Sequence, residues 1–158
     1  MVIFKIKYKM KKLLVLLFLS LSLTAMAQIH NPVKWTTKAI KISDTEYELV
    51  ATASIEDEWH LYSQSVPQDG PIPTKFVFQG NANYLKKGNT TEGVGKTIDD
   101  PVFEMKIKYF AHKADFKQRI KLKGKTPFEV KATVEFMVCN DTQCLPPTDV
   151  DLVFKVAK

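Results

Sequence analysis

The chain has 158 residues, with 23 Lys and Arg against 17 Asp and Glu, and a formal net charge of +6. Five of the basic residues fall in the first 27 positions, which leaves 18 basic against 17 acidic residues in the 131 that follow. This near-neutral remainder gives no reason to expect a nucleic-acid or acidic-lipid partner, and its length suits one domain with an ordinary core.

The N-terminus has the order of a secretory signal peptide. Residues 1–12 carry five lysines and no acid, residues 13–23 are almost wholly apolar, and Ala25 and Ala27 are small residues at the positions that signal peptidase reads. The apolar stretch is shorter than the roughly 20 residues that a membrane span needs. We therefore expect cleavage after residue 27, export to the periplasm and no stable membrane insertion afterwards. The alternative is an uncleaved N-terminal anchor.

Apolar residues recur with period two along most of the remaining chain. The alternating runs predict half-buried strands at 34–42, 47–55, 74–78, 103–109, 116–122, 128–138 and 150–156, the first and third of them weaker than the rest. Seven or eight strands separated by turn residues predict an all-β fold, an immunoglobulin-like antiparallel β-sandwich that forms one domain over residues 28–158. The segment 80–101 has little periodicity and is expected to be a long, functional loop.

The only two cysteines, Cys139 and Cys144, lie beside a turn that ends at Pro146 and Pro147. In an exported protein two cysteines favour a disulfide. A ring this small removes little chain entropy, about 2 kcal/mol, which favours a bond that opens and closes. A structural staple is the alternative. Even-numbered residues of the strand 128–138 face the core, so Cys139 is predicted to point outward.

Other kinds of site find less support. Zinc needs four ligands and the cysteines supply two, while His30, His60 and His112 are better explained as surface or packing residues. We therefore expect no metal, and no cofactor beyond the disulfide itself. The chain offers no hydrolase constellation, phosphate-binding loop or paired carboxylates. Tyr62, in the aromatic run 59–62, is a candidate neighbour of the disulfide, as are Asp141 and Pro146.

The segment from Val134 through Cys139 and Cys144 to Pro147 resembles the redox hairpin of the N-terminal periplasmic domain of the DsbD thiol:disulfide interchange proteins. The runs 59–64 and 70–74 resemble early strands of that domain, especially in Bacteroidetes-type sequences. The resemblance implies an immunoglobulin-like sandwich that takes electrons from a membrane electron transporter and passes them to thioredoxin-like periplasmic proteins, including those of cytochrome c biogenesis. It also implies that Cys139 and Cys144 are the redox pair and that Cys144 forms the mixed disulfide.

The family shields its cysteines with a cap loop, and the resemblance assigns that role to Glu92, Gly93, Val94, Gly95 and Lys96. Familiar members have five residues between the cysteines, whereas this chain has four. They carry an aromatic ring at the cap tip, where Gly93 and Val94 stand, and of their two acidic residues only Glu92 is matched, with Thr91 in the other place. Glycines on both sides of Val94 predict a mobile loop.

Three functions follow as hypotheses. The first is a periplasmic thiol–disulfide carrier of the oxidoreductase type, formed by a free-standing or truncated domain. The second is a secreted binding or adhesion sandwich with a purely structural disulfide. The third is a scaffold derived from the redox domain that holds a partner without electron transfer.

Overall fold

The computed structural model describes residues 30–100 and 103–157, so the predicted signal peptide over residues 1–27 lies outside the described part. Residues 32–158 form one compact unit. The described residues of this unit contain strands and no helix. The strands are β1 (Val33–Lys41), β2 (Glu46–Ile55), β3 (His60–Tyr62), β4 (Lys75–Phe78), β5 (Tyr84–Glu92), β6 (Lys96–Asp100), β7 (Met105–Phe110), β8 (Lys113–Leu122), β9 (Phe128–Phe136), β10 (Val138–Cys139) and β11 (Thr148–Val156).

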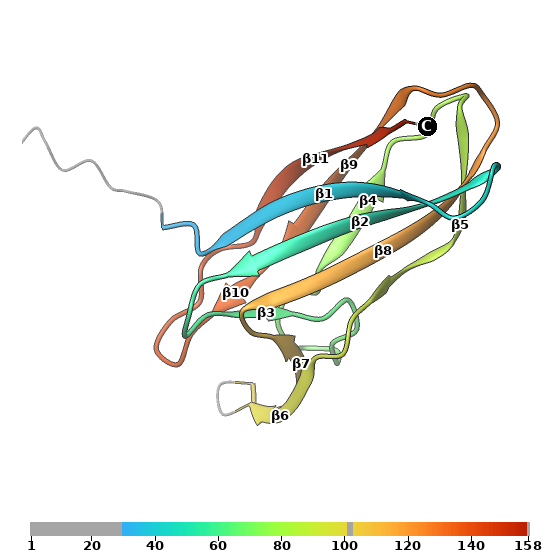
Figure 1. Cartoon of the computed structure of the whole chain (residues 1–158). Coiled ribbons are helices and arrows are strands. Elements are labelled where there is room, and N and C mark those ends of the chain that lie inside the picture. The colour runs from blue at the N-terminus through green and yellow to red at the C-terminus, as the bar shows by residue number, and fades with distance from the viewer. Residues whose placement is uncertain (1–29, 101–102, 158) are drawn as a thin grey trace, which may run out of the picture. The chain divides into compact units, whose positions relative to one another are not determined.

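Two antiparallel sheets face each other across the main core (Figure 1). One has the strand order β1-β2-β8-β5 and the other β11-β9-β4. A third antiparallel sheet, of order β10-β3-β7-β6, gathers at one end of the sandwich (Figure 1). The predicted immunoglobulin-like antiparallel β-sandwich is confirmed, with more strands than the seven or eight expected.

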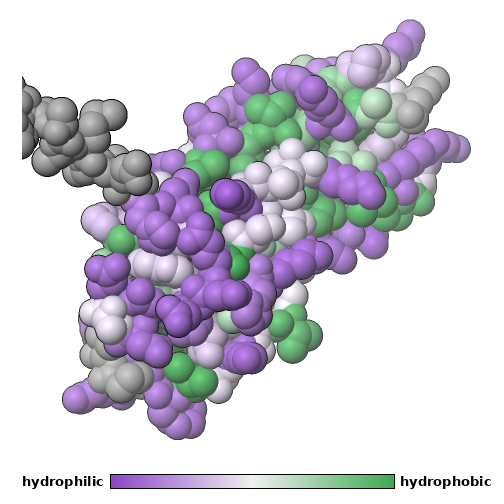
Figure 2. Space-filling model, turned by 60° about the vertical axis from the view of Figure 1, so that its left-hand side comes forward, coloured by the Kyte–Doolittle hydropathy of each residue, from purple (hydrophilic) through white to green (hydrophobic). Residues whose placement is uncertain are grey.

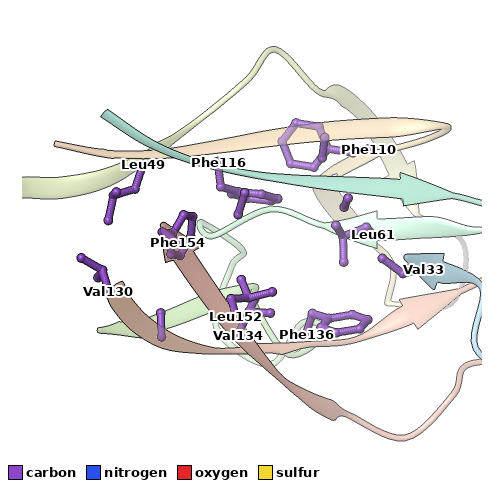
Figure 3. Close-up of a cluster of buried hydrophobic side chains, with 14 of the residues drawn as sticks. Val33, Leu49, Leu61, Phe110, Phe116, Val130, Val134, Phe136, Leu152 and Phe154 are labelled. Carbon is purple, nitrogen blue, oxygen red and sulfur yellow. The ribbon is translucent and has the colours of Figure 1, made fainter. Parts of the chain in front are cut away.

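Strict alternation of side chains builds the main core. Odd-numbered residues of β2, such as Leu49 and Ala51, and even-numbered residues of β9, such as Val130 and Val134, are buried. They meet Phe116 of β8 between the sheets (Figure 3). Each large apolar side chain buried in this way contributes roughly 1.5–3 kcal/mol. Hydrophilic residues cover much of the face shown in Figure 2, with smaller apolar groups between them. The fold therefore depends on the alternating strands that the sequence reveals.

The prediction of a long loop over residues 80–101 is wrong, because β5 and β6 occupy most of it. β5 is an edge strand whose residues 85–89 are exposed, so it has no apolar alternation to detect. It is held by backbone pairing with β8, interrupted by an irregularity between Lys87 and Thr91. There the buried Gln118 donates its side-chain amide to the carbonyls of Lys87 (3.2 Å) and Gly88 (3.3 Å). Polar contacts thus replace apolar burial in this strand.

Candidate functional site

The cysteines lie where one strand passes from the second sheet to the third. β9 ends at Phe136, and after Met137 the chain continues as β10, which pairs with β3. The alternation persists across this break: Val138 belongs to the main core, and Cys139 belongs to a second, smaller cluster. Cys139 points away from the main core, as predicted, but it is only 4% exposed rather than open to solvent. The side of the strand opposite the main core is covered rather than solvated.

Cys139 and Cys144 form a disulfide, with 4.0 Å between their α-carbons. The tight turn between them is held by its own hydrogen bonds: Asn140 N donates to Gln143 O (2.9 Å), and Asn140 Oδ1 accepts from Gln143 N (2.9 Å). Leu145 N then donates to Val138 O (2.9 Å). Unlike Cys139, Cys144 is exposed. The turn therefore presents one cysteine of the disulfide to solvent and keeps the other inside.

His60 is the cross-strand partner of Cys139, because these two residues pair in the register of β10 and β3. On its other side Cys139 pairs with Cys144 through an isolated antiparallel bridge. The His60 ring packs against the ring of Tyr109 on β7, with 4.3 Å between centroids. Cys139 thus stands between its disulfide partner and a histidine that sequence analysis treated as a packing residue.

The second cluster surrounds Cys139 with aromatic and aliphatic groups. Its buried members are Tyr62, Ile107 and Cys139, packed against Val66, Phe103, Met105, Tyr109 and Met137. Burial, reinforced by the negative charge of Asp100, raises the pKa of Tyr62 to about 12, so its phenol is neutral at physiological pH. The structure therefore brings the predicted neighbour Tyr62 into the cluster of Cys139. Asp141 in the turn and Pro146 after Cys144 are both exposed.

Phe103 supplies the aromatic cover of this cluster. It lies in the turn between β6 and β7, and its ring meets that of Tyr62 edge to face, 6.3 Å between centroids. Sequence analysis placed Phe103 inside a strand and missed this role. The available signal was the run Asp99-Asp100-Pro101, a sequence typical of turns, which ends two positions before Phe103.

The expected cap, residues 92–96, leads into β6, which lies at the opposite edge of the third sheet from β10. It connects β5 to β6, and in the third sheet β3 and β7 lie between β6 and β10. Val94 at its tip is fully exposed. Gly95 is not a flexible point but a site of close packing, because a β-carbon there would lie 2.6 Å from Tyr109 O. This connection therefore packs on β7, and β3 lies between β7 and the strand that carries Cys139.

Glu92 anchors the same connection. Its carboxylate accepts hydrogen bonds from Ser63 Oγ (2.5 Å), Gln64 N (2.8 Å) and Lys108 Nζ (2.9 Å). Burial alone would raise the pKa of Glu92, but the hydrogen bonds from Gln64, Ser63 and Lys108 and the charge of Lys108 outweigh burial and hold that pKa below its usual value. Glu92 thus ties β5 to the residues after β3 and to β7.

Two further properties concern ligands and membranes. In residues 30–100 and 103–157, no group of three or more His, Cys, Asp or Glu side chains is arranged to hold a metal ion. Over the same stretch, no helix has the length and apolar character to cross a membrane.

The chain resembles the reduced N-terminal domain of DsbD from Neisseria meningitidis with a TM-score of 0.50 and 13% identity, over 78% of this chain and 86% of that one. The N-terminal periplasmic domain of ScsB from Proteus mirabilis gives a TM-score of 0.51 and 15% identity, over 83% of this chain and 48% of that one. At these identities the likeness concerns the fold.

Sequence comparison gives the family. No curated protein matches the chain in such a comparison. The family described as "Thiol:disulfide interchange protein DsbD, N-terminal" matches residues 31–154, which include both cysteines, their turn and all but the last residues of the sandwich. With so much of its length matched, the chain belongs to the family of DsbD N-terminal domains.

Proposed function

We propose that this domain is a periplasmic thiol–disulfide carrier, which passes electrons through Cys139 and Cys144 between a membrane electron transporter and thioredoxin-like proteins. The observation that carries the proposal is the unequal exposure of the pair, with Cys144 exposed and Cys139 4% exposed. Family membership adds the expectation of thiol–disulfide chemistry. The domain needs no cofactor besides its disulfide.

The unequal exposure assigns the two sulfurs different roles. When the bond is oxidised, a partner thiolate attacks the Sγ atom of Cys144, since exchange requires access to the attacked sulfur. A partner–Cys144 disulfide forms, and Cys139 leaves as a thiolate. In the opposite direction, the Cys144 thiolate attacks a partner disulfide, and Cys139 then closes the ring and releases the reduced partner. Two electrons move in each complete exchange.

Phe103 takes the shielding role that the resemblance assigned to residues 92–96. Its ring covers Tyr62 in the cluster that contains Cys139. A partner surface that displaces the Phe103 ring gains access to the inner cysteine, Cys139, whereas small thiols in solution reach only the exposed Cys144. The exposed Pro146-Pro147 edge after Cys144 adds a stiff surface for the partner to contact.

Trapping with a thioredoxin-like domain that lacks its own resolving cysteine tests the assignment. Cys139→Ser should accumulate a mixed disulfide through Cys144, while Cys144→Ser should accumulate little, because its remaining thiol is buried. Equal trapping by both variants would contradict the different roles assigned to Cys144 and Cys139. No trapping by either, with partners shown to be active on another substrate, would overturn the carrier function.

The competing function is a binding sandwich with a structural disulfide, and the burial of Cys139 favours it. The same protein distinguishes the two. A carrier loses its disulfide to a mild dithiol while folded, whereas a structural bond resists until the protein is denatured.

A further inference from the structure

Cys139 and His60 are directly opposite each other on neighbouring antiparallel strands. Residues opposed in this way project from the same face, with about 4.5–5.5 Å between their β-carbons. The His60 ring is also held in place, because it packs against the ring of Tyr109 at 4.3 Å. A titratable ring is therefore fixed beside the inner cysteine of the disulfide.

The proposed carrier function creates a need for such a group. Thiol–disulfide exchange proceeds through thiolates, yet burial disfavours the ionised form of a cysteine. Cys139 is 4% exposed in an aromatic and aliphatic cluster, so its thiolate requires a nearby proton acceptor or positive charge.

The other titratable groups around this face are less suited to that task. Tyr62 is neutral and supplies no positive charge. The negative charge of Asp100 disfavours a second negative charge, such as the Cys139 thiolate. Lys96 pairs with Tyr109 from β6, on the far side of β7. Three acidic residues in the neighbouring connections are exposed: Glu58 before β3, Glu104 before β7 and Asp141 after β10. His60 is the group placed directly opposite the sulfur-bearing residue.

We propose that His60 accepts the thiol proton of Cys139 and holds the resulting thiolate as an imidazolium–thiolate pair. The proposal rests on the carrier function. In the closing step, Cys139 gives its proton to His60, and its thiolate attacks Cys144 Sγ in the mixed disulfide. The Cys139–Cys144 bond forms, the bond between Cys144 and the partner breaks, and the partner leaves as a thiolate. The imidazolium then returns its proton to the leaving thiolate or to solvent. In the opening step, the same imidazolium stabilises Cys139 as it leaves.

Ionisation of Cys139 can be measured without any partner. In the Cys144→Ser protein, the ultraviolet absorbance of the Cys139 thiolate is followed against pH. Adding His60→Phe keeps a ring against Tyr109 but removes the proton acceptor, and should lower the thiolate fraction at neutral pH about tenfold. Tyr109→Phe is the matched control: it removes a hydroxyl, keeps the ring and should leave the thiolate fraction unchanged. An unchanged fraction with His60→Phe, or an equal loss with Tyr109→Phe, would overturn the proposal.

The wild-type protein provides a second measurement that does not depend on a variant folding. The imidazole resonances of His60 are titrated by NMR in the oxidised and the reduced protein. The reduced protein should hold the His60 proton to higher pH, because a thiolate beside it favours the imidazolium. Identical titrations in the two states would refute the pairing. The carrier function is tested separately. If that function is wrong, partner trapping fails, while both of these measurements of the His60–Cys139 pair remain positive.

Discussion

The ring of Phe103 stands edge-on to the ring of Tyr62, with an interplanar angle of 87° and 6.3 Å between centroids. The contact joins a turn residue to a buried tyrosine of β3, whose cluster also contains Cys139. Because Phe103 is half-buried at the edge of this cluster, its removal should open the inner side of the disulfide without disturbing the main core.

We therefore predict that Phe103→Ala speeds reduction of the disulfide by a small dithiol several-fold. It should cost about 1–2 kcal/mol of stability, less than the roughly 3–5 kcal/mol for a fully buried Phe. Val94→Ala is the control, since Val94 is fully exposed at the tip of the segment to which the family resemblance assigned the cap role. The rate is followed by alkylation of the released thiols. A faster reaction in Val94→Ala, with no change in Phe103→Ala, would return the shielding role to residues 92–96.

Removing both cysteines should leave the domain folded. Neither Cys139 nor Cys144 belongs to the main core, and the ring they close is worth about 2 kcal/mol on the loop-closure relation. A Cys139→Ser, Cys144→Ser variant should thus unfold in a single transition at a modestly lower urea concentration. A loss of the cooperative transition would show that the disulfide is structural.

The strands could be predicted where burial of one face imposes alternation. β2, β9 and β11 each bury every second residue, and all three appear in the sequence. β5 could not be found this way, because its exposed residues are held by backbone pairing and by Gln118. For Cys139 the alternation correctly predicts a side chain on the face away from the main core. It wrongly predicts that this face is open to solvent. Local period-two patterning contains no information about the distant segments, β3, β7 and Phe103, that cover that face.

Gly95 is a second residue whose role depends on a distant segment that the local sequence does not reveal. In the sequence it resembles a hinge, yet a β-carbon at this position would lie 2.6 Å from Tyr109 O and 2.9 Å from Lys108 Cε. Gly95→Ala must therefore push β6 away from β7 and should cost about 1–3 kcal/mol, as overpacking does. At Gly93 the added carbon meets only Asp115 O, at 3.8 Å, so Gly93→Ala should cost much less. Equal effects on the unfolding midpoint would mean that the connection is as flexible as its glycines predict.

Glu92 should make the stability of the domain depend on pH. Its side chain is 13% exposed and accepts hydrogen bonds from Ser63, Gln64 and Lys108. The folded protein holds the pKa of Glu92 below the pKa of about 4.3 that this group has in the unfolded chain. The stabilisation is therefore fully present at pH values above the unfolded-state pKa, and it is lost as the pH falls through the folded-state pKa.

Glu92→Gln should accordingly cost about 1.5–3 kcal/mol at neutral pH, the range for hydrogen bonds to a charged group, and the difference from wild type should shrink in acid. Asp99→Asn is the control, because Asp99 pairs with Lys106 where both side chains are more than 70% exposed, and such pairs contribute little. Urea unfolding of the three proteins across acidic and neutral pH measures these differences. If wild type and Glu92→Gln differ by the same amount at every pH, the carboxylate does not hold β5 to β7 through its charge, and packing at Glu92 accounts for the whole effect.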